Sequence, residues 1–171
     1  DTLVATVMSN LGLHKYARDN GLELAQTQVG DRYVLEEMLK EGYNLGGEQS
    51  GHVILLDYNP TGDGILTSLM LIQAILEANK TASQMAEIIK LYPQVLVNAK
   101  VNADKKYDYN KDTEIQEAIE KLEKEFAGNG RVLIRPSGTE PLVRVMIEGE
   151  DQEYITKKAK EIADLIEKKL K

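Results

Sequence analysis

The order of apolar and polar positions predicts strands that alternate with helices in the first half of the chain. Apolar runs at residues 2–8, 22–28 and 53–57 have the length and composition of strands. Between them, residues 10–20 and 31–40 carry apolar side chains at helical spacing, and a glycine follows each segment. Strands that alternate with helices indicate an α/β layer, in which helices cover a sheet.

The segment 63–78 is the most apolar helix that the pattern predicts. Its apolar residues cover too wide a face for a surface helix: they are Ile65, Leu66, Leu69, Met70, Ile72 and Leu76. Because a helix that is apolar on most sides is normally buried, we expect 63–78 to be the buried helix of its unit. A shorter helix is expected at 83–90, with Thr81 or Ser83 as its N-cap.

A change of composition near residues 91–98 divides the chain into two predicted domains, 1–93 and 94–171. The second domain follows the order β-α-β-β-α, with a strand at 95–101, a polar linker at 104–111, a helix at 113–126, a hairpin at 131–148 and a helix at 152–170. This order is typical of a small two-layer α+β domain. The expected fold class is therefore an α/β domain followed by an α+β domain.

Composition argues against several classes of protein. The net charge is −7, and neither domain has the basic surface of a nucleic-acid binder: 1–93 holds 6 basic and 12 acidic residues, and 94–171 holds 15 and 16. The chain has no cysteine, which excludes disulfides and agrees with a cytoplasmic location. It contains no apolar run near the roughly 18 residues of a membrane span. The first residues do not resemble a signal peptide and suggest a strand already under way, as in a piece of a longer chain.

The hairpin at 131–148 carries the most informative chemistry. Its polar turn consists of Arg135, Pro136, Ser137, Gly138 and Thr139, and Arg144 lies on the strand that follows. A guanidinium can pair bidentately with phosphate oxygens, and the N–H groups of a glycine-containing turn form an anion-binding concavity. The turn therefore predicts phosphate binding, although the same residues also suit an ordinary hairpin loop. The side chain of Arg144 can point either toward the turn or toward solvent.

A second polar cluster lies between the helix at 31–40 and the strand at 53–57. It consists of Glu48, Gln49, Ser50, Gly51 and His52, preceded by two further glycines. A carboxylate and an amide can each bind neighbouring sugar hydroxyls, and a histidine can exchange a proton near neutral pH. Taken by itself, His52 could equally be a structural histidine that is hydrogen-bonded in the fold.

Together these segments resemble the C-terminal half of the α-D-phosphohexomutases, over essentially all 171 residues. Three motifs carry the resemblance: Val29-Gly-Asp-Arg-Tyr-Val34, Gly47-Glu-Gln-Ser-Gly-His52 and Arg135-Pro-Ser-Gly-Thr-Glu-Pro141. The third motif is the most specific for the family, and the first two are most similar to its glucosamine branch. The resemblance implies that 1–93 and 94–171 are the third and fourth of four domains.

The resemblance also implies a role for each motif. The turn 135–139 would hold the phosphate already on the sugar, and 47–52 would hold the ring hydroxyls. His52 would either assist proton transfer at the reacting hydroxyl or orient the substrate. Asp31 and Arg32 would face the active-site cleft as candidate substrate contacts, although Asp31 could simply be a helix N-cap.

The reaction that the resemblance implies interconverts glucosamine 6-phosphate and glucosamine 1-phosphate, a step toward cell-wall amino sugars. A phosphoserine and a Mg²⁺ ion serve this reaction, and glucosamine 1,6-bisphosphate is its intermediate. The serines of this chain lie outside a phosphoserine-type loop: they are Ser9, Ser50, Ser68, Ser83 and Ser137. Asp57 and Asp63 do not suggest a metal site, because Asp63 suits a helix cap.

We therefore expect no mutase activity from this chain by itself. Its partners would be a phosphosugar and the absent N-terminal domains of the same enzyme, with a hinge near residues 92–98. Three alternatives stay open: a fragment of a glucose- or mannose-specific mutase, a non-catalytic phosphosugar-binding module, and an acidic protein-interaction domain. His14, inside a predicted helix, is expected to be structural or exposed.

Overall fold

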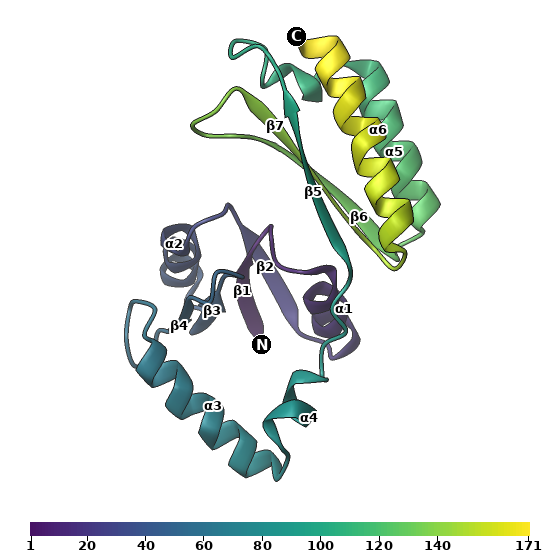
Figure 1. Ribbon diagram of the computed structural model, residues 1–171. Coiled ribbons are helices and arrows are strands. Elements are labelled where there is room, and N and C mark those ends of the chain that lie inside the picture. Colours follow the sequence, from purple (N-terminus) through teal and green to yellow (C-terminus); the bar gives the residue numbers. More distant parts are fainter. The chain divides into compact units, whose positions relative to one another are not determined.

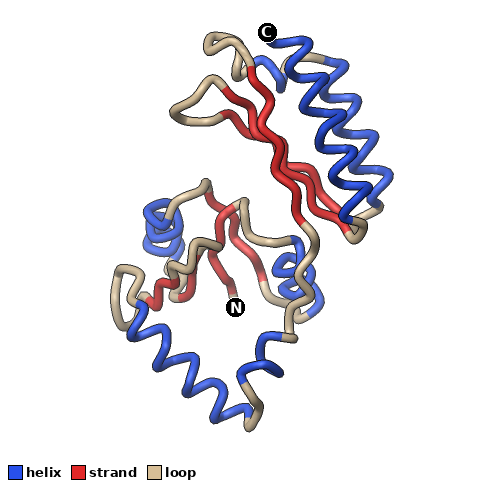
Figure 2. The backbone as a smooth tube through the Cα atoms, in the orientation of Figure 1, coloured by secondary structure: helices blue, strands red, loops and turns tan.

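The computed structural model describes all 171 residues and divides them into two units, Asp1–Leu91 and Tyr92–Lys171. Each unit contains one sheet and its own helices, which are labelled in Figure 1 and coloured by type in Figure 2. The two units are described separately below.

The first unit is built on a four-stranded sheet with the order β2-β1-β3-β4. Its strands are β1 (Thr2–Thr6), β2 (Glu23–Thr27), β3 (Leu45–Gly47) and β4 (Val53–Leu55). β1 is parallel to both β2 and β3, and β4 is antiparallel to β3. The sequence did not predict β3, because a three-residue strand with two glycines has little intrinsic strand propensity and forms only by pairing with its neighbours.

The helices of the first unit are α1 (Leu11–Asp19), α2 (Asp31–Glu41), α3 (Gly64–Ala78) and α4 (Ala82–Ala86). α4 is shorter than the helix expected at 83–90, and its N-terminus is closed by a capping box in which Thr81 and Gln84 bond to each other's backbone N–H groups. α2 ends at Gly42, which adopts the left-handed conformation that glycine tolerates best.

α2 packs against one face of the sheet and forms the core of the first unit. The buried residues of this core are Val4, Val34, Met38 and Ile54. Gly46 on β3 permits the close approach, because a Cβ atom there would lie 2.6 Å from the Met38 sulfur and 2.7 Å from a Val34 methyl carbon. These few residues form a small core.

The expectation that 63–78 is a buried helix is wrong. α3 forms over nearly the expected residues, but none of its residues is buried. Four apolar side chains on it are strongly exposed: Ile65 by 78%, Leu69 by 61%, Ile72 by 53% and Leu76 by 73%. The side chains of α3 favour burial, but burial also requires a surface that covers them, and no other element of this unit does so.

The second unit has a three-stranded antiparallel sheet with the order β5-β7-β6. Its elements follow the expected β-α-β-β-α order: β5 (Gln94–Lys100), the 3₁₀ turn η1 (Asp108–Asn110), α5 (Thr113–Phe126), β6 (Gly130–Pro136), β7 (Leu142–Gly149) and α6 (Gln152–Leu170). α5 and α6 lie side by side against one face of the sheet (Figure 1). The structure thus confirms the expected fold class of an α/β unit followed by an α+β unit.

Alternating residues of β7 supply the centre of the second core, because they point to the same face of the sheet. Val143, Val145 and Ile147 are fully buried against the apolar side of α6. α6 contributes Ile155, Ala159, Ile162 and Ile166, and α5 contributes Ile115, Leu122 and Phe126. This core is much larger than that of the first unit, and residues of both β6 and β7 pack in it.

Candidate functional site

The turn between β6 and β7 presents two arginines on one face of the hairpin. Arg135 and Arg144 are directly opposite each other in the register of the two strands, so their side chains share a face. A terminal guanidinium nitrogen of Arg144 lies 3.6 Å from Glu140 within the turn. Of the two orientations left open by the sequence, Arg144 thus adopts the one toward the turn.

These two arginines form a pair of like charges, of which Arg144 also contacts the exposed carboxylate of Glu140. Like charges that face each other across paired strands repel. The Nε atoms of Arg135 and Arg144 are both buried and have no hydrogen-bond partner. Burial, together with the nearby charge of Arg144, holds the pKa of Arg135 below its ordinary value. An anion on this face would accept hydrogen bonds from both guanidinium groups and remove their repulsion.

The turn itself is fixed by its own hydrogen bonds. The Ser137 backbone N–H donates to the Leu142 carbonyl at 2.8 Å, and the Ser137 hydroxyl accepts from the Glu140 N–H at 3.2 Å. Ser137 is buried, whereas Gly138 and Thr139 are exposed at the tip. The Ser137 hydroxyl therefore has a structural partner within the turn in addition to any ligand that it binds.

Lys106 is a residue of this site that the sequence reading missed. Its ammonium donates to the Ser137 carbonyl at 2.9 Å, from a segment that was expected to be a polar linker. Near it, the Tyr109 hydroxyl donates to the Ile134 carbonyl at 3.3 Å, and burial raises the pKa of Tyr109. No motif marks Lys106. The only signal in the sequence is a pair of lysines upstream of the phosphate-type turn.

In the first unit, residues 47–52 form a tight turn between β3 and β4. The Glu48 N–H donates to the His52 carbonyl at 2.9 Å, and the Gly51 N–H donates to the Glu48 carbonyl at 3.0 Å. Gly47 is required here, because a Cβ atom on it would lie 2.6 Å from the His52 carbonyl oxygen. Gly51 has a φ of 99°, a conformation that favours glycine.

Three side chains of this turn form a hydrogen-bonded chain. The Ser50 hydroxyl lies 2.6 Å from a Glu48 carboxylate oxygen and 3.0 Å from His52 Nδ1. Because a hydroxyl has one proton, which Ser50 donates to Glu48, the contact with His52 requires a proton on Nδ1. This tautomer leaves Nε2 of His52 as the ring nitrogen that can accept a proton. The second carboxylate oxygen of Glu48 accepts from the Gly30 N–H at 3.1 Å.

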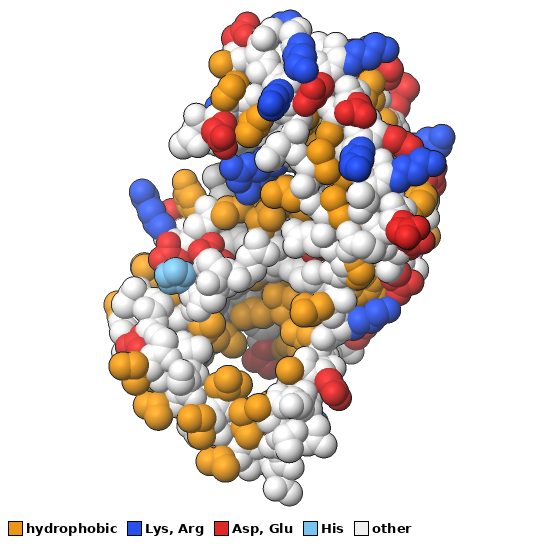
Figure 3. Space-filling model, viewed as in Figure 1, with side chains coloured by type: hydrophobic (Ala, Val, Ile, Leu, Met, Phe, Trp, Pro, Cys, Tyr) orange, Lys and Arg blue, Asp and Glu red, His pale blue; other side chains and the backbone are white.

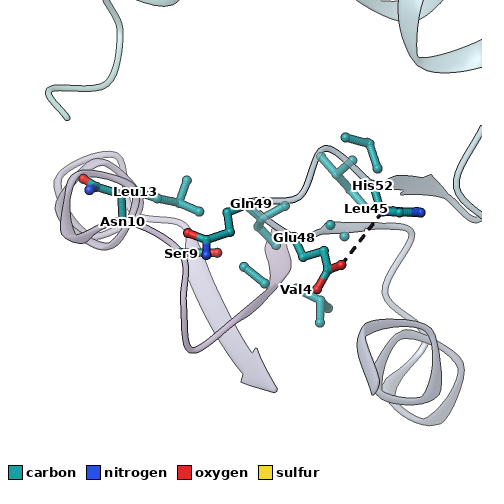
Figure 4. A pocket seen from close by; sticks show the side chains of 13 residues that line it. Val4, Ser9, Asn10, Leu13, Leu45, Glu48, Gln49 and His52 are labelled. Carbon is teal, nitrogen blue, oxygen red and sulfur yellow. Dashed lines mark ion pairs between the residues drawn. The ribbon is translucent and has the colours of Figure 1, made fainter. Parts of the chain in front are cut away.

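A cavity of about 270 Å³ opens beside this turn (Figure 4). Glu48, Gln49 and His52 lie along its polar edge, and Figure 4 shows that Gln49 extends toward Ser9. The rest of its wall is mainly apolar and comes from β1, α1 and β3, including Leu3, Leu13 and Leu45. The turn thus combines convergent polar groups with a concave surface, as small-molecule sites usually do.

The other candidate residues lie at helix starts or are exposed. The N-cap of α2 is Gly30 rather than Asp31, which corrects the cap suggested for Asp31. The Arg32 side chain is exposed and paired with Glu36 at 2.7 Å, and this hydrogen bond raises the pKa of Arg32. His14 is half-buried on α1.

The aspartates considered as metal ligands have other roles in the fold. Asp63 is the N-cap of α3 and accepts from the Ile65 and Leu66 N–H groups, each at 3.0 Å. These bonds, with that from Leu66 the largest cause, lower the pKa of Asp63. Asp57 accepts from the Asn44 side chain at 2.9 Å. No group of three or more His, Asp or Glu side chains is close enough to hold a metal ion. None of the helices is long and apolar enough to cross a membrane.

The chain thus consists of an α/β unit with a polar turn at 47–52, followed by an α+β unit with a polar turn at 135–139. Residues 1–92 match the family model described as phosphoglucomutase/phosphomannomutase, alpha/beta/alpha domain III, and residues 96–165 match the model of its C-terminal domain. The chain therefore belongs to the phosphoglucomutase/phosphomannomutase family.

Among curated proteins, the chain is similar to bacterial phosphoglucosamine mutases. It is 62% identical to that of Caldicellulosiruptor bescii over 170 residues, which is 99% of this chain and 38% of the relative. It is 58% identical to that of Clostridioides difficile, again over 99% of this chain and 38% of the relative. The chain thus spans less than two fifths of the length of these relatives.

Solved structures of the family share the fold. The N-acetylphosphoglucosamine mutase of Aspergillus fumigatus superposes with a TM-score of 0.79 at 20% identity, over 98% of this chain and 38% of that protein. A structure of the same Aspergillus fumigatus enzyme, in complex with GlcNAc-6P and magnesium, superposes with a TM-score of 0.75 at 17% identity, over 98% of this chain and 38% of that one. At these identities the likeness establishes the fold alone.

Proposed function

We propose that this chain supplies the sugar and phosphate recognition of a phosphoglucosamine mutase, which interconverts glucosamine 6-phosphate and glucosamine 1-phosphate. The high identity to bacterial phosphoglucosamine mutases supports this choice of substrate within the family. The observation that carries the proposal is the pair of opposed guanidinium groups of Arg135 and Arg144, whose buried Nε atoms have no partner.

The phosphate of the substrate binds between these two arginines. A phosphate dianion accepts several charge-assisted hydrogen bonds at once and converts the repulsion of the guanidinium groups into attraction. The N–H groups at the tip of the turn, at Gly138 and Thr139, add donors to the same concavity. Pro136 fixes the backbone where β6 leads into this turn.

The sugar ring binds at the turn 47–52 through Glu48, Gln49, Ser50 and His52. Glu48 and Ser50 hold the imidazole of His52 in the tautomer with the proton on Nδ1. Its Nε2 can then either accept the proton of the reacting hydroxyl or orient that hydroxyl. A His52→Gln variant of the complete enzyme separates the two roles, because proton transfer requires a large loss of kcat and a changed pH profile, whereas orientation mainly raises KM.

The transfer of the phosphoryl group takes place on a part of the enzyme that lies outside these residues. A phosphoserine donates its phosphoryl group to the free hydroxyl of the bound sugar, and the proton of this hydroxyl passes to a base. The bisphosphate intermediate then returns its other phosphoryl group to the serine, and the sugar oxygen that is released takes up a proton. The residues described here do not fit a Mg²⁺ site, so the ligands of the magnesium that the family implies lie elsewhere. The chain alone is inactive in this scheme.

The intermediate must present each phosphate in turn, so the C-terminal unit moves on a hinge. Residues 94–98 belong to β5 and are held in the sheet of the second unit. The hinge proposed for 92–98 therefore narrows to the residues around the unit boundary, Leu91–Pro93.

An amide NMR titration with glucosamine 6-phosphate tests the proposal, with glucosamine, inorganic phosphate, glucose 6-phosphate and mannose 6-phosphate as comparison ligands. We expect the largest shifts at 47–52 and 135–139, for glucosamine 6-phosphate, and larger at pH 7.5 than at pH 5 because the second pKa of a phosphomonoester is about 6. Arg135→Ala should weaken binding by roughly tenfold or more, since a charged hydrogen bond contributes about 1.5–3 kcal/mol.

The matched control for this titration is Arg18→Ala, which removes an exposed arginine of α1 that is paired with Asp19. Unchanged affinity in Arg135→Ala, or an equal loss in Arg18→Ala, contradicts the proposed phosphate site. Equal shifts with glucosamine 6-phosphate, glucose 6-phosphate and mannose 6-phosphate contradict the choice of glucosamine as the sugar. They do not contradict the proposed phosphate site.

A further inference from the structure

The turn that carries the candidate phosphate site also carries a negative charge. Glu140 follows Thr139 directly, and one of its carboxylate oxygens lies 3.6 Å from a terminal guanidinium nitrogen of Arg144. A carboxylate beside a site for phosphate is unexpected, because it repels the ligand and pairs with a cation that the ligand needs. The position of Glu140 therefore requires an explanation.

The backbone of Glu140 is held at both its N–H and its carbonyl group. The N–H donates to the Ser137 hydroxyl at 3.2 Å, and the carbonyl accepts from the Leu142 N–H at 2.9 Å. Pro141 follows and restricts the backbone further. The turn thus fixes the start of the side chain beside Arg144, while the side chain itself is 56% exposed and can turn toward solvent.

An exposed ion pair is not unusual in the second unit. Residues 94–171 hold 15 basic and 16 acidic residues, and Figure 3 shows both kinds interspersed over the surface of this unit. On α5, for example, Glu120 and Lys124 are also 3.6 Å apart. Such pairs contribute little to stability. Glu140 differs because its partner is one of two opposed arginines whose buried Nε atoms have no hydrogen-bond partner.

We propose that Glu140 competes with the substrate phosphate for Arg144 and thereby limits how tightly the turn holds this phosphate. This role rests on the proposed function. A phosphate dianion displaces the carboxylate, because it can accept hydrogen bonds from both arginines at once. Glu140 then either turns to solvent, which breaks its ion pair, or stays near the phosphate and repels it. In both cases the affinity is lower than it would be without the carboxylate.

A moderate affinity suits the proposed reaction. The bisphosphate intermediate must present each of its phosphates in turn, so the phosphate at the turn has to leave before the other one replaces it. Among related complexes, differences of affinity lie mainly in the dissociation rate. By weakening the hold of Arg144, Glu140 speeds this release. It is a positioning residue, since it acts through Arg144 and makes no bond to the phosphate.

Titration of the chain with inorganic phosphate at low ionic strength, followed at the amides of 135–139, tests the inference. Glu140→Gln keeps the size of the side chain and removes its charge, so we expect the affinity to rise by roughly three- to tenfold. The NMR line shapes should give a dissociation rate that is slower by a similar factor. The gain should shrink at about 0.5 M NaCl, because salt screens exposed charges.

Two further variants separate this role from a structural one. Glu140→Asp keeps the carboxylate and should bind phosphate nearly as the wild type does, whereas a role in the shape of the turn would make it similar to Glu140→Gln. Glu120→Gln is the matched control, because it removes one charge from an exposed pair with the same distance. α5 packs against the face of the sheet opposite Arg144, so phosphate affinity should change by less than about twofold in this control.

Unchanged or weaker phosphate binding in Glu140→Gln overturns the inference, since Glu140 would then have no effect on Arg144 or would orient it for the ligand. An equal gain in Glu120→Gln also overturns it, because the effect would come from net charge alone. If the wild-type chain shows no shifts at 135–139 with phosphate, the proposed phosphate site itself fails. Shifts in the wild type without a gain in Glu140→Gln reject only the role of Glu140.

Discussion

At the scale of single residues, the candidate phosphate site is marked by charged side chains that lack hydrogen-bond partners within the fold. Arg135 and Arg144 face each other on paired strands with buried, unpartnered Nε atoms. In contrast, Arg131, on the same β6 strand, contacts the buried carboxylate of Glu148 at 2.6 Å. Arg131 is thus paired with a fully buried carboxylate, whereas Arg135 and Arg144 face a like charge, and Arg144 contacts the exposed carboxylate of Glu140 at 3.6 Å.

This contrast predicts that a change of Arg144 affects binding much more than stability. In Arg144→Gln, we expect phosphosugar affinity to fall by roughly tenfold or more, because one charged donor is lost. The free energy of unfolding without ligand should change by no more than a few tenths of a kcal/mol, because the repulsion with Arg135 is relieved while the contact with the exposed carboxylate of Glu140 is lost. Urea unfolding and ligand titration of the same variant check both effects. A variant that loses stability and affinity together would mean that Arg144 has a structural role.

Lys106 gives a second prediction at this scale. Its ammonium holds the Ser137 carbonyl and adds positive charge at the turn. Lys106→Met should lower phosphosugar affinity several-fold and shift the Ser137 and Gly138 amides, whereas Lys106→Arg should retain most of the affinity because it keeps the donor and the charge.

Lys105→Met is the control for Lys106→Met, because Lys105 instead donates to the C-terminal residue, Lys171. Titration of the three variants with glucosamine 6-phosphate separates the outcomes. Similar affinities in Lys106→Met and Lys105→Met would show that Lys106 does not contribute to the site.

At the scale of elements, helix ends are fixed by individual side chains. Asp151 caps α6 by accepting from the N–H groups of Glu153 and Tyr154, at 2.9 and 3.0 Å. Asp112 caps α5 in the same way, by accepting from Ile115 at 3.1 Å. Both caps follow from local sequence, because an Asp before a helix satisfies N–H groups that have no partner within the helix.

The cap of α6 can be tested without touching the site. Asp151→Ala should lower the free energy of unfolding of the second unit by about 1 kcal/mol, and Asp151→Asn should cost much less, because asparagine also caps. Urea unfolding followed by far-UV circular dichroism measures the difference. Equal losses in the two variants would mean that the charge of Asp151, rather than its hydrogen bonds, stabilises the helix.

At the scale of the whole molecule, the two units differ in how complete their cores are. The second unit buries fourteen residues of one apolar cluster, whereas the α2-side core of the first unit contains four. Apolar area removed from water is the main source of folding free energy. The second unit is therefore expected to be the more stable of the two when each is isolated.

We predict that residues 92–171 fold when expressed alone. A two-state unfolding curve with a stability of about 4–12 kcal/mol is expected for a domain of this size. The isolated unit should also show the shifts of 135–139 with inorganic phosphate, since Arg135, Arg144 and Lys106 all belong to it. Residues 1–91 expressed alone should be less stable. A narrow amide spectrum from 92–171 alone would contradict this prediction.

The sequence by itself determined most of the elements, the fold class and the motifs. Helix and strand periodicities are local, and the residues of a turn such as 135–139 are adjacent in the chain, so both can be recognised without a structure. The orientation of Arg144, the role of Lys106 and the strand β3 could not be recognised in this way. The orientation of Arg144 depends on how the hairpin turn places Glu140. The role of Lys106 depends on Ser137, and the strand β3 on β1, which are both far away in the sequence.

Only the tertiary structure decided whether the side chains of α3 are buried or exposed. Its sequence specifies an apolar helix, and that helix forms, but whether its side chains are buried depends on which surface covers them. The apolar side chains of α3 determine how much free energy their burial would contribute. Whether they are buried depends on the other elements of the assembled domain. In this protein, the sequence specifies where the helix and the turns form. The tertiary packing decides which of their side chains contact another element and are buried.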